Sequence, residues 1–157
     1  MAGPVHTGMP LTDQRFKVGP NPSNGRWGTI RCGGPCKDDY DRINILQQGH
    51  AGDGRYVKLQ QAALNSLVVV QDNIGFPVFV TGHGWRSCAD QRDLHAQDPA
   101  RYASADESFH CRGLAIDVDQ SVTSQHLEEI HNALRTHDWF QSRPTSEPWH
   151  YSFGCEG

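Results

Sequence analysis

Four side chains with the chemistry of a metal-dependent hydrolytic site lie in two short stretches of the sequence. His110 and Asp117 belong to residues 108–117, and Glu147 and His150 lie near the end of the chain. Two histidine nitrogens and one carboxylate oxygen form a zinc ligand set that leaves a fourth position for water. A further carboxylate beside that water is a candidate general base. The sequence therefore predicts a Zn²⁺ site at His110, Asp117 and His150, with Glu147 as the base.

Asp117 differs from an ordinary surface aspartate because it lies within an apolar run. Alternation over residues 114–119 predicts a strand with two faces, Leu114, Ile116 and Val118 on one and Ala115, Asp117 and Asp119 on the other. Burying an unpaired charge is costly, and binding a metal ion removes that cost. Taken singly, each candidate also fits a structural role, since the chain has nine histidines and Asp117 could end a strand.

Three motifs occur in order along residues 55–153. The first is Gly-Trp-Arg-Ser at residues 84–87, followed by Gln91. The second is Ser-x-His-x-x-Gly-x-Ala-x-Asp at residues 108–117, and the third is Glu-x-Trp-His at residues 147–150. Together they resemble the D-alanyl-D-alanine carboxypeptidase family of zinc peptidases, which includes VanY-type carboxypeptidases and phage L-alanyl-D-glutamate endolysins.

The resemblance implies a role for each matching position. The implied zinc ligands are His110, Asp117 and His150. Glu147 would be the general base, and Arg86 would hold a substrate carboxylate or the polarised carbonyl oxygen. A guanidinium fork suits either partner because it forms charge-assisted hydrogen bonds with oxygen. Ser108 would position the substrate by hydrogen bonding, and Gln91 would support the site.

The sequence has unusual residues within and beside the motifs of the family. Trp85 replaces the usual tyrosine, and His83 is an additional histidine for which we expect a local structural role. Cys111 is a soft donor directly after His110, but its side chain should point elsewhere. The chain has five cysteines, so at least one is unpaired within it. A disulfide between Cys88 and Cys111 is one possibility in an oxidising compartment.

The elements around the motifs predict an α+β domain in which a small antiparallel sheet packs with about three helices around one zinc site. Helical spacing from residue 55 to 73 ends at Gly75, and a strand is expected over residues 76–80. A short helix capped by Asp90 should stop at Pro99. The remaining elements are a strand at residues 114–119, a helix from Thr123 or Ser124, a core pair at residues 139–140 and a strand at residues 149–153.

The chain divides by composition into two parts. Residues 1–50 are rich in glycine and proline and lack periodicity, which predicts an irregular N-terminal arm that wraps the domain or serves as a tether. The Cys32-Gly-Gly-Pro-Cys36 segment lies in this arm, and we interpret it as a loop with free or pairing thiols. Residues 51–157 would form the zinc peptidase domain.

The charge and hydropathy of the chain exclude several classes of function. A formal charge of −4 provides no basic surface for nucleic acid and little attraction to an anionic membrane. No apolar run is long enough for membrane insertion, and no secretory signal is visible at the N-terminus. We therefore expect a monomer that reaches the cell wall through lysis or on a phage particle.

These observations lead to one main hypothesis and one alternative from a different class. The main hypothesis is a zinc metallopeptidase that hydrolyses the stem peptide of bacterial peptidoglycan. Within it, an L-alanyl-D-glutamate endopeptidase, a D,D-carboxypeptidase and a cytoplasmic dipeptidase stay open, with a phage-type lysin favoured. The alternative is a non-catalytic zinc domain that binds a wall component or a partner protein. Glu147, Arg86 and Ser108 favour the enzyme, because a binding module has no need for this set.

Overall fold

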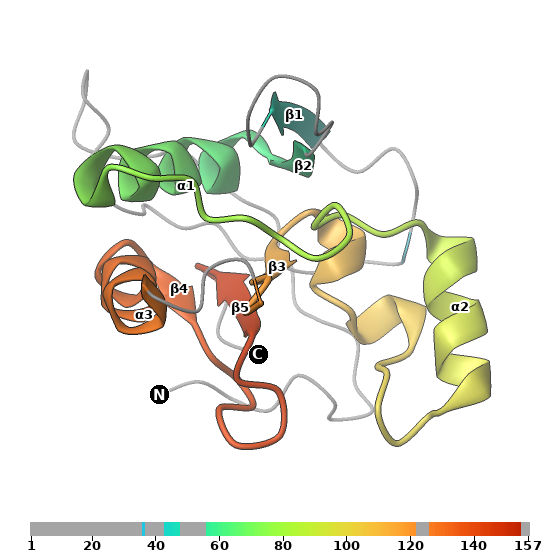
Figure 1. The fold of residues 1–157 in the computed structure, drawn as a ribbon. Helices are drawn as coiled ribbons and strands as arrows, with labels where there is room; N and C mark the ends of the chain where they lie inside the picture. Colours follow the sequence, from blue (N-terminus) through green and yellow to red (C-terminus); the bar gives the residue numbers. More distant parts are fainter. Residues whose placement is uncertain (1–35, 37–42, 48–55, 122–125, 155–157) are drawn as a thin grey trace.

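A computed structural model describes Cys36 and residues 43–47, 56–121 and 126–154 of the chain (Figure 1). Within these ranges, three α-helices, two short 3₁₀ turns and two antiparallel sheets form an α+β fold. The predicted fold class is therefore confirmed. Most of the predicted N-terminal arm, residues 1–50, lies outside the described residues.

The first sheet corrects two expectations about secondary structure. Strand β1 (Ile43–Gln47) pairs antiparallel with β2 (Tyr56–Gln60), although residues 43–47 were expected to be irregular and 56–60 to be helical. The helical prediction is wrong at residues 56–60 because burial there has a period of two. Val57 and Leu59 are both 0% exposed, whereas their neighbours Tyr56 and Lys58 are partly exposed.

Helix α1 (Gln61–Ile74) follows β2 without a loop and ends where the sequence predicts. Gly75 adopts a left-handed conformation with φ 81°, and its N–H donates to the Gln71 carbonyl oxygen over 2.8 Å. Only glycine enters this conformation without steric cost. The inner face of the helix buries Leu67 and Val70 in the core.

The expected strand at residues 76–80 reduces to a single bridge, between Val80 and Val118. Pro77 has no N–H to contribute to a ladder, and the N–H of Val78 donates to the side chain of Gln71 over 2.9 Å. Pairing with the sheet therefore begins only at the end of the segment, where it holds the loop that carries Arg86.

The second sheet has the order β3-β5-β4, formed by β3 (Ala115–Asp117), β4 (Trp139–Phe140) and β5 (His150–Phe153). Its strands are antiparallel, and the register places Asp117 directly opposite His150. Strand pairing thus brings together two candidate ligands that lie 33 residues apart in the sequence.

Helix α2 (Cys88–Gln97) is capped by Ser87 rather than by Asp90. The Ser87 hydroxyl accepts a hydrogen bond of 3.1 Å from the Asp90 N–H, so Asp90 lies inside the first turn. Prediction failed here because two residues with good capping side chains stand three positions apart. The helix ends before Pro99, as expected.

Helix α3 (Leu127–Thr136) packs against α1, on the opposite side of the second sheet from α2 (Figure 1). The predicted starting residues, Thr123 and Ser124, lie outside the described residues. Ile130 and Leu134 are both 0% exposed and join Trp139 in the core, as the sequence predicts. No helix in the described ranges is long and apolar enough to span a membrane.

A disulfide connects Cys36 to Cys88 at the start of α2. The possible pairing of Cys88 with Cys111 is therefore wrong. Cys111 is buried, and its thiol lies 3.9 Å from the Ser87 carbonyl oxygen. Cys36 is held near α2 by a second contact, because its N–H donates to the Asp106 carboxylate over 3.0 Å.

Candidate metal centre

Three side chains from three different elements converge on one point. His110 begins the 3₁₀ turn η2 (His110–Arg112), Asp117 ends β3 and His150 begins β5. The Asp117 Oδ1 atom lies 3.4 Å from His110 Nε2 and 3.1 Å from His150 Nδ1. All three candidate ligand atoms lie within 4.8 Å of one another. Ligands of a tetrahedral zinc ion stand roughly 3.4 Å apart, so the cluster could bind one metal ion.

Each histidine has a hydrogen-bond partner at the ring nitrogen that faces away from Asp117. This leaves His110 Nε2 and His150 Nδ1 available for a metal ion. His110 Nδ1 lies 2.7 Å from the Gly84 carbonyl oxygen, which can only accept, so Nδ1 carries the proton and donates. His150 Nε2 lies 3.2 Å from the Ser152 hydroxyl. The carbonyl partner fixes the tautomer of His110, and both contacts orient the rings, as is usual for metal-binding histidines. Sequence reasoning identified neither Gly84 nor Ser152 as a partner.

The same geometry requires a positive charge at the centre of the cluster. With its Nδ1 proton donated to Gly84, a neutral His110 directs the Nε2 lone pair at the Asp117 carboxylate. Two acceptors facing each other repel, so either a proton or a metal cation must lie between them. The two imidazole nitrogens and the carboxylate oxygen therefore fit a divalent metal ion.

Asp117 is ionised in this environment. Burial raises the pKa of its carboxyl group, but the charges and hydrogen bonds of His110 and His150 outweigh that effect and hold the pKa well below its usual range. An ionised carboxylate is the form that binds metal.

The backbone of Gly84, whose carbonyl oxygen accepts from His110, lies close against β2. Its φ is 78°, and an added Cβ would lie 2.9 Å from Val57 Cγ2 and 3.0 Å from the Lys58 carbonyl oxygen. The adjacent loop is bound to β2, because Lys58 N–H donates to His83 O over 2.6 Å and Trp85 N–H donates to Lys58 O over 2.9 Å. Strand β2 thereby positions the carbonyl group that orients His110.

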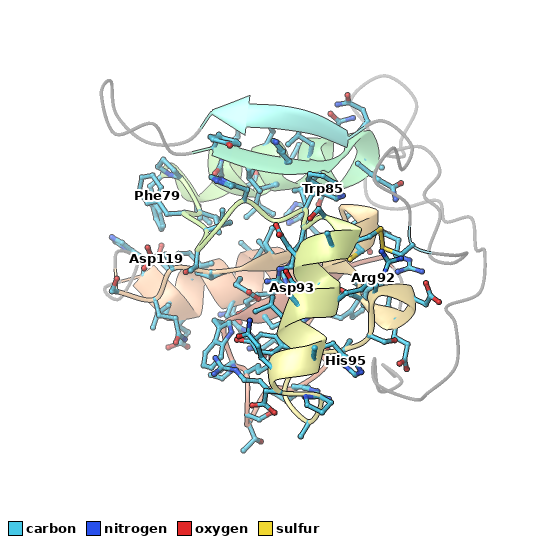
Figure 2. All side chains as sticks on the ribbon, turned by 90° about the vertical axis from the view of Figure 1, so that its right-hand side faces the viewer. Phe79, Trp85, Arg92, Asp93, His95 and Asp119 are labelled. Atoms are coloured by element: carbon cyan, nitrogen blue, oxygen red, sulfur yellow. A yellow bond between two sulfur atoms is a disulfide. The ribbon has the colours of Figure 1, made fainter. Side chains whose placement is uncertain are left out.

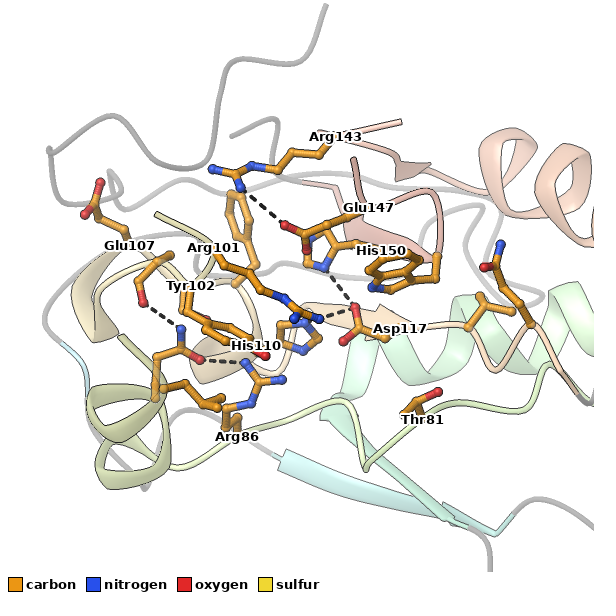
Figure 3. A pocket seen from close by; sticks show the side chains of 18 residues that line it. Thr81, Arg86, Arg101, Tyr102, Glu107, His110, Asp117, Arg143, Glu147 and His150 are labelled. Atoms are coloured by element: carbon orange, nitrogen blue, oxygen red, sulfur yellow. Dashed lines mark hydrogen bonds and ion pairs between the residues drawn. The ribbon is translucent and has the colours of Figure 1, made fainter. Parts of the chain in front are cut away.

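The cluster opens onto a cavity of about 470 Å³, within the usual size range of small-ligand sites. Its lining includes all seven residues to which the sequence analysis assigned a role, namely Arg86, Gln91, Ser108, His110, Asp117, Glu147 and His150. It also includes three charged residues that the sequence analysis missed, which are Arg101, Glu107 and Arg143 (Figure 3). Only their charge could have identified them, because none belongs to a motif.

Glu147 is held at the cavity by its neighbours in a tight loop. Its Oε2 atom lies 3.2 Å from Arg143 Nη1, and its N–H donates to the Arg143 carbonyl oxygen over 2.8 Å. The N–H of His150 in turn donates to the Glu147 carbonyl oxygen over 3.0 Å. The base candidate and the third ligand candidate are therefore positioned by one continuous turn.

Arg86 is positioned through Gln91. The Arg86 N–H donates to the His110 carbonyl oxygen over 3.1 Å, and its Nη1 donates to Gln91 Oε1 over 2.7 Å. Gln91 is 2% exposed, and its amide donates to the Ala103 carbonyl oxygen over 2.6 Å. Ser108 is also buried at the cavity wall, with 4% exposure.

His83 takes no part in the metal cluster. Its ring stacks on Tyr56 with centroids 4.1 Å apart, and its Nδ1 lies 3.3 Å from the Tyr56 carbonyl oxygen. Both contacts connect the loop to β2. Among the described residues, the group able to hold a metal includes neither His83 nor Cys111.

Comparisons with known proteins do not assign the chain to a family. No family model and no curated protein matches the chain. Among solved structures, it is similar to the LdcB LD-carboxypeptidase, whose structure was described as revealing the molecular basis of peptidoglycan recognition. The identity is 18%, the match covers 71% of this chain and 84% of that one, and the TM-score is 0.31. A likeness at this TM-score carries no argument about activity.

Proposed function

We propose that this protein is a zinc-dependent peptidase that hydrolyses the stem peptide of bacterial peptidoglycan. The observation that carries the proposal is the shared cavity. It combines the His110, Asp117 and His150 cluster with an acidic side chain, Glu147, and an arginine, Arg86. A site that only binds metal needs no base and no oxyanion partner at the same cavity.

The chain's own side chains divide the work of hydrolysis. His110, Asp117 and His150 would hold a zinc ion, which would supply Lewis-acid chemistry to polarise the scissile carbonyl and acidify water. Glu147 takes the proton from the attacking water and passes it to the leaving amine nitrogen. Arg143 binds Oε2 of Glu147, which leaves the other carboxylate oxygen for that transfer. Arg86, held by Gln91, stabilises a substrate carboxylate or the developing oxyanion.

Two bonds of the stem peptide are the candidates for cleavage. A D,D-carboxypeptidase would remove the terminal D-alanine, and an L-alanyl-D-glutamate endopeptidase would cut within the stem. The motif resemblance supports both, and a phage-type cell-wall lysin is the proposed setting.

The test is a muropeptide digest with metal-free protein, to which zinc is added back and whose products are followed by mass spectrometry. We expect zinc-dependent release of stem-peptide fragments, whose masses identify the bond. Tight binding of stem peptide without turnover would support a non-catalytic zinc domain instead. An absence of zinc-dependent cleavage across peptidoglycan types would refute the peptidase.

A further inference from the structure

We propose that Arg101 selects the substrate by binding a second carboxylate, distinct from the group held by Arg86. The preferred substrate would then be a peptide with two free carboxylates. This inference rests on the proposed function, because it specifies the chemistry of the substrate for that same site.

Three arginines and three acidic side chains line the cavity, so its own charges balance and a bound metal ion would make it positive. Of its three arginines, Arg143 is paired with Glu147, while Arg86 donates to a neutral amide oxygen. The Arg101 guanidinium lies over the Tyr102 ring at 5.1 Å, and it forms no ion pair within the described ranges. Two guanidinium groups therefore face the cavity without a carboxylate partner among the described residues.

The acidic groups of the cavity are engaged elsewhere. Asp117 Oδ1 contacts both histidines of the cluster, Glu147 binds Arg143, and Glu107 accepts a hydrogen bond of 2.8 Å from the Ser104 hydroxyl. A metal ion would add further positive charge. With that ion bound, the cavity would favour an anionic ligand although the whole chain has a net charge of −4.

Arg101 is held in a defined position despite its exposure. Its N–H donates to the Asp98 carbonyl oxygen over 3.2 Å, and the next carbonyl, of Tyr102, lies 2.8 Å from His95 Nδ1 on α2. Its side chain points into the cavity (Figure 3). Stacking on Tyr102 uses the face of the guanidinium and leaves its N–H donors free for a carboxylate.

The two arginines approach the cavity from opposite ends of α2. Arg86 precedes the N-cap residue Ser87, and Arg101 follows the C-cap residue Asp98. A helix of 10 residues is about 15 Å long. Because the two side chains enter the cavity from different loops, we assign them to two separate carboxylates of one peptide.

The experiment compares synthetic stem peptides in which each free carboxyl group is amidated in turn. The zinc-loaded full chain is used, with kcat/KM measured for cleaved peptides and Kd measured by calorimetry for peptides that bind uncleaved. In the parent protein, we expect amidation at one position to weaken recognition by about tenfold or more, the range of a lost charge-assisted pair. In Arg101→Gln, the same amidation should change recognition by less than about twofold.

Arg92→Gln is the matched control. Arg92 lies on α2 and is exposed, but it does not line the cavity (Figure 2). This variant should keep the full carboxylate preference. Arg101→Lys should keep part of it, because a point charge lacks the bidentate fork.

The outcomes separate this inference from the proposed function. If no peptide is cleaved but binding shows an Arg101-dependent carboxylate preference, the role of Arg101 is supported and the proposed peptidase function is refuted. If peptides are cleaved and Arg101→Gln prefers carboxylate over amide as strongly as Arg92→Gln, the peptidase stands and the inference is overturned. Failure of every stem peptide to bind would overturn both.

Discussion

At the scale of single residues, the arrangement of hydrogen bonds around the two imidazole rings prepares the cluster for a cation. The Gly84 carbonyl oxygen lies 2.7 Å from His110 Nδ1, and the Ser152 hydroxyl lies 3.2 Å from His150 Nε2. Each ring therefore directs its other nitrogen at the Asp117 carboxylate. A bound cation would take the place of the protons through which the histidines now contact this carboxylate.

Ser152→Ala tests whether the hydroxyl orients His150. Removing it frees the ring to rotate or change tautomer, and zinc affinity should fall by about 10- to 100-fold. Competition with a chromophoric chelator measures the affinity. Ser142→Ala is the matched control, because the Ser142 hydroxyl is buried and has no hydrogen-bond partner in the part of the chain that the structure describes. Equal affinities in the two variants would show that Ser152 does not orient the ligand.

Glu147→Gln separates the base from the ligands. The substitution keeps the shape of the side chain but removes its ability to accept a proton. Activity should fall by about 10²- to 10⁴-fold, while zinc stoichiometry is retained. Metal analysis and kinetics on the same preparation measure both. Loss of zinc together with activity would mean that Glu147 supports the metal site instead.

At the scale of elements, β2 and the loop after Val80 act together to position the site. The loop carries Gly84 and Arg86, and its backbone is bonded to Lys58 of β2 on both sides of Gly84. The bridge between Val80 and Val118 attaches the other end of the loop to the strand that carries Asp117. A change in how the loop packs on β2 should therefore affect both stability and metal binding.

Gly84→Ala tests this close approach, with Gly82→Ala as its control. Both glycines have a left-handed conformation, but an added Cβ at Gly82 meets nothing within 4 Å, whereas at Gly84 it meets Val57 and the Lys58 carbonyl oxygen. The control should lose about 1–2 kcal/mol of unfolding free energy from backbone strain alone. We expect Gly84→Ala to lose about 1 kcal/mol or more beyond that.

Urea denaturation measures the two unfolding free energies, and chelator competition measures zinc affinity. Only Gly84→Ala should also weaken zinc binding, because it displaces the carbonyl group that accepts from His110. Similar losses in both variants would show that the loop can shift away from β2 without consequence.

At the scale of the whole molecule, α3 is connected to the second sheet by a buried polar contact as well as by core packing. Tyr151 of β5 is 4% exposed, and its hydroxyl lies 2.9 Å from His131 Nδ1 on α3. Burial raises the pKa of Tyr151 to about 12, and burial also lowers the pKa of His131. Both shifts favour the neutral forms, which can share one hydrogen bond.

Alkaline unfolding should reveal this contact. An unfolded tyrosine loses its proton near pH 10, whereas folded Tyr151 keeps its proton until about pH 12. The folded state binds more protons between these values, so stability should fall as the pH rises through this window. Urea denaturation at several pH values measures the slope. Tyr151→Phe should have a shallower slope, and an identical slope would assign the pH dependence to other groups.

The sequence alone identified the candidate metal ligands and the candidate base. His110, Asp117, Glu147 and His150 were identified because motif spacing and strand alternation are local properties of the chain. The same local patterns predicted the end of α1 at Gly75 and the core positions of α3. They failed at residues 56–60, where periods of two and of 3.6 both fit the apolar positions.

The tertiary structure decided how these residues are held. The pairing of Asp117 with His150 depends on strand register, and the orientation of His110 depends on a glycine carbonyl 26 residues earlier. Arg101 and Arg143 likewise reach the cavity from loops. The loop of Arg101 packs on α2, and the loop of Arg143 precedes β5. Such contacts join segments distant in the sequence, and their partners carry no local signal, because any carbonyl or hydroxyl group can accept a hydrogen bond.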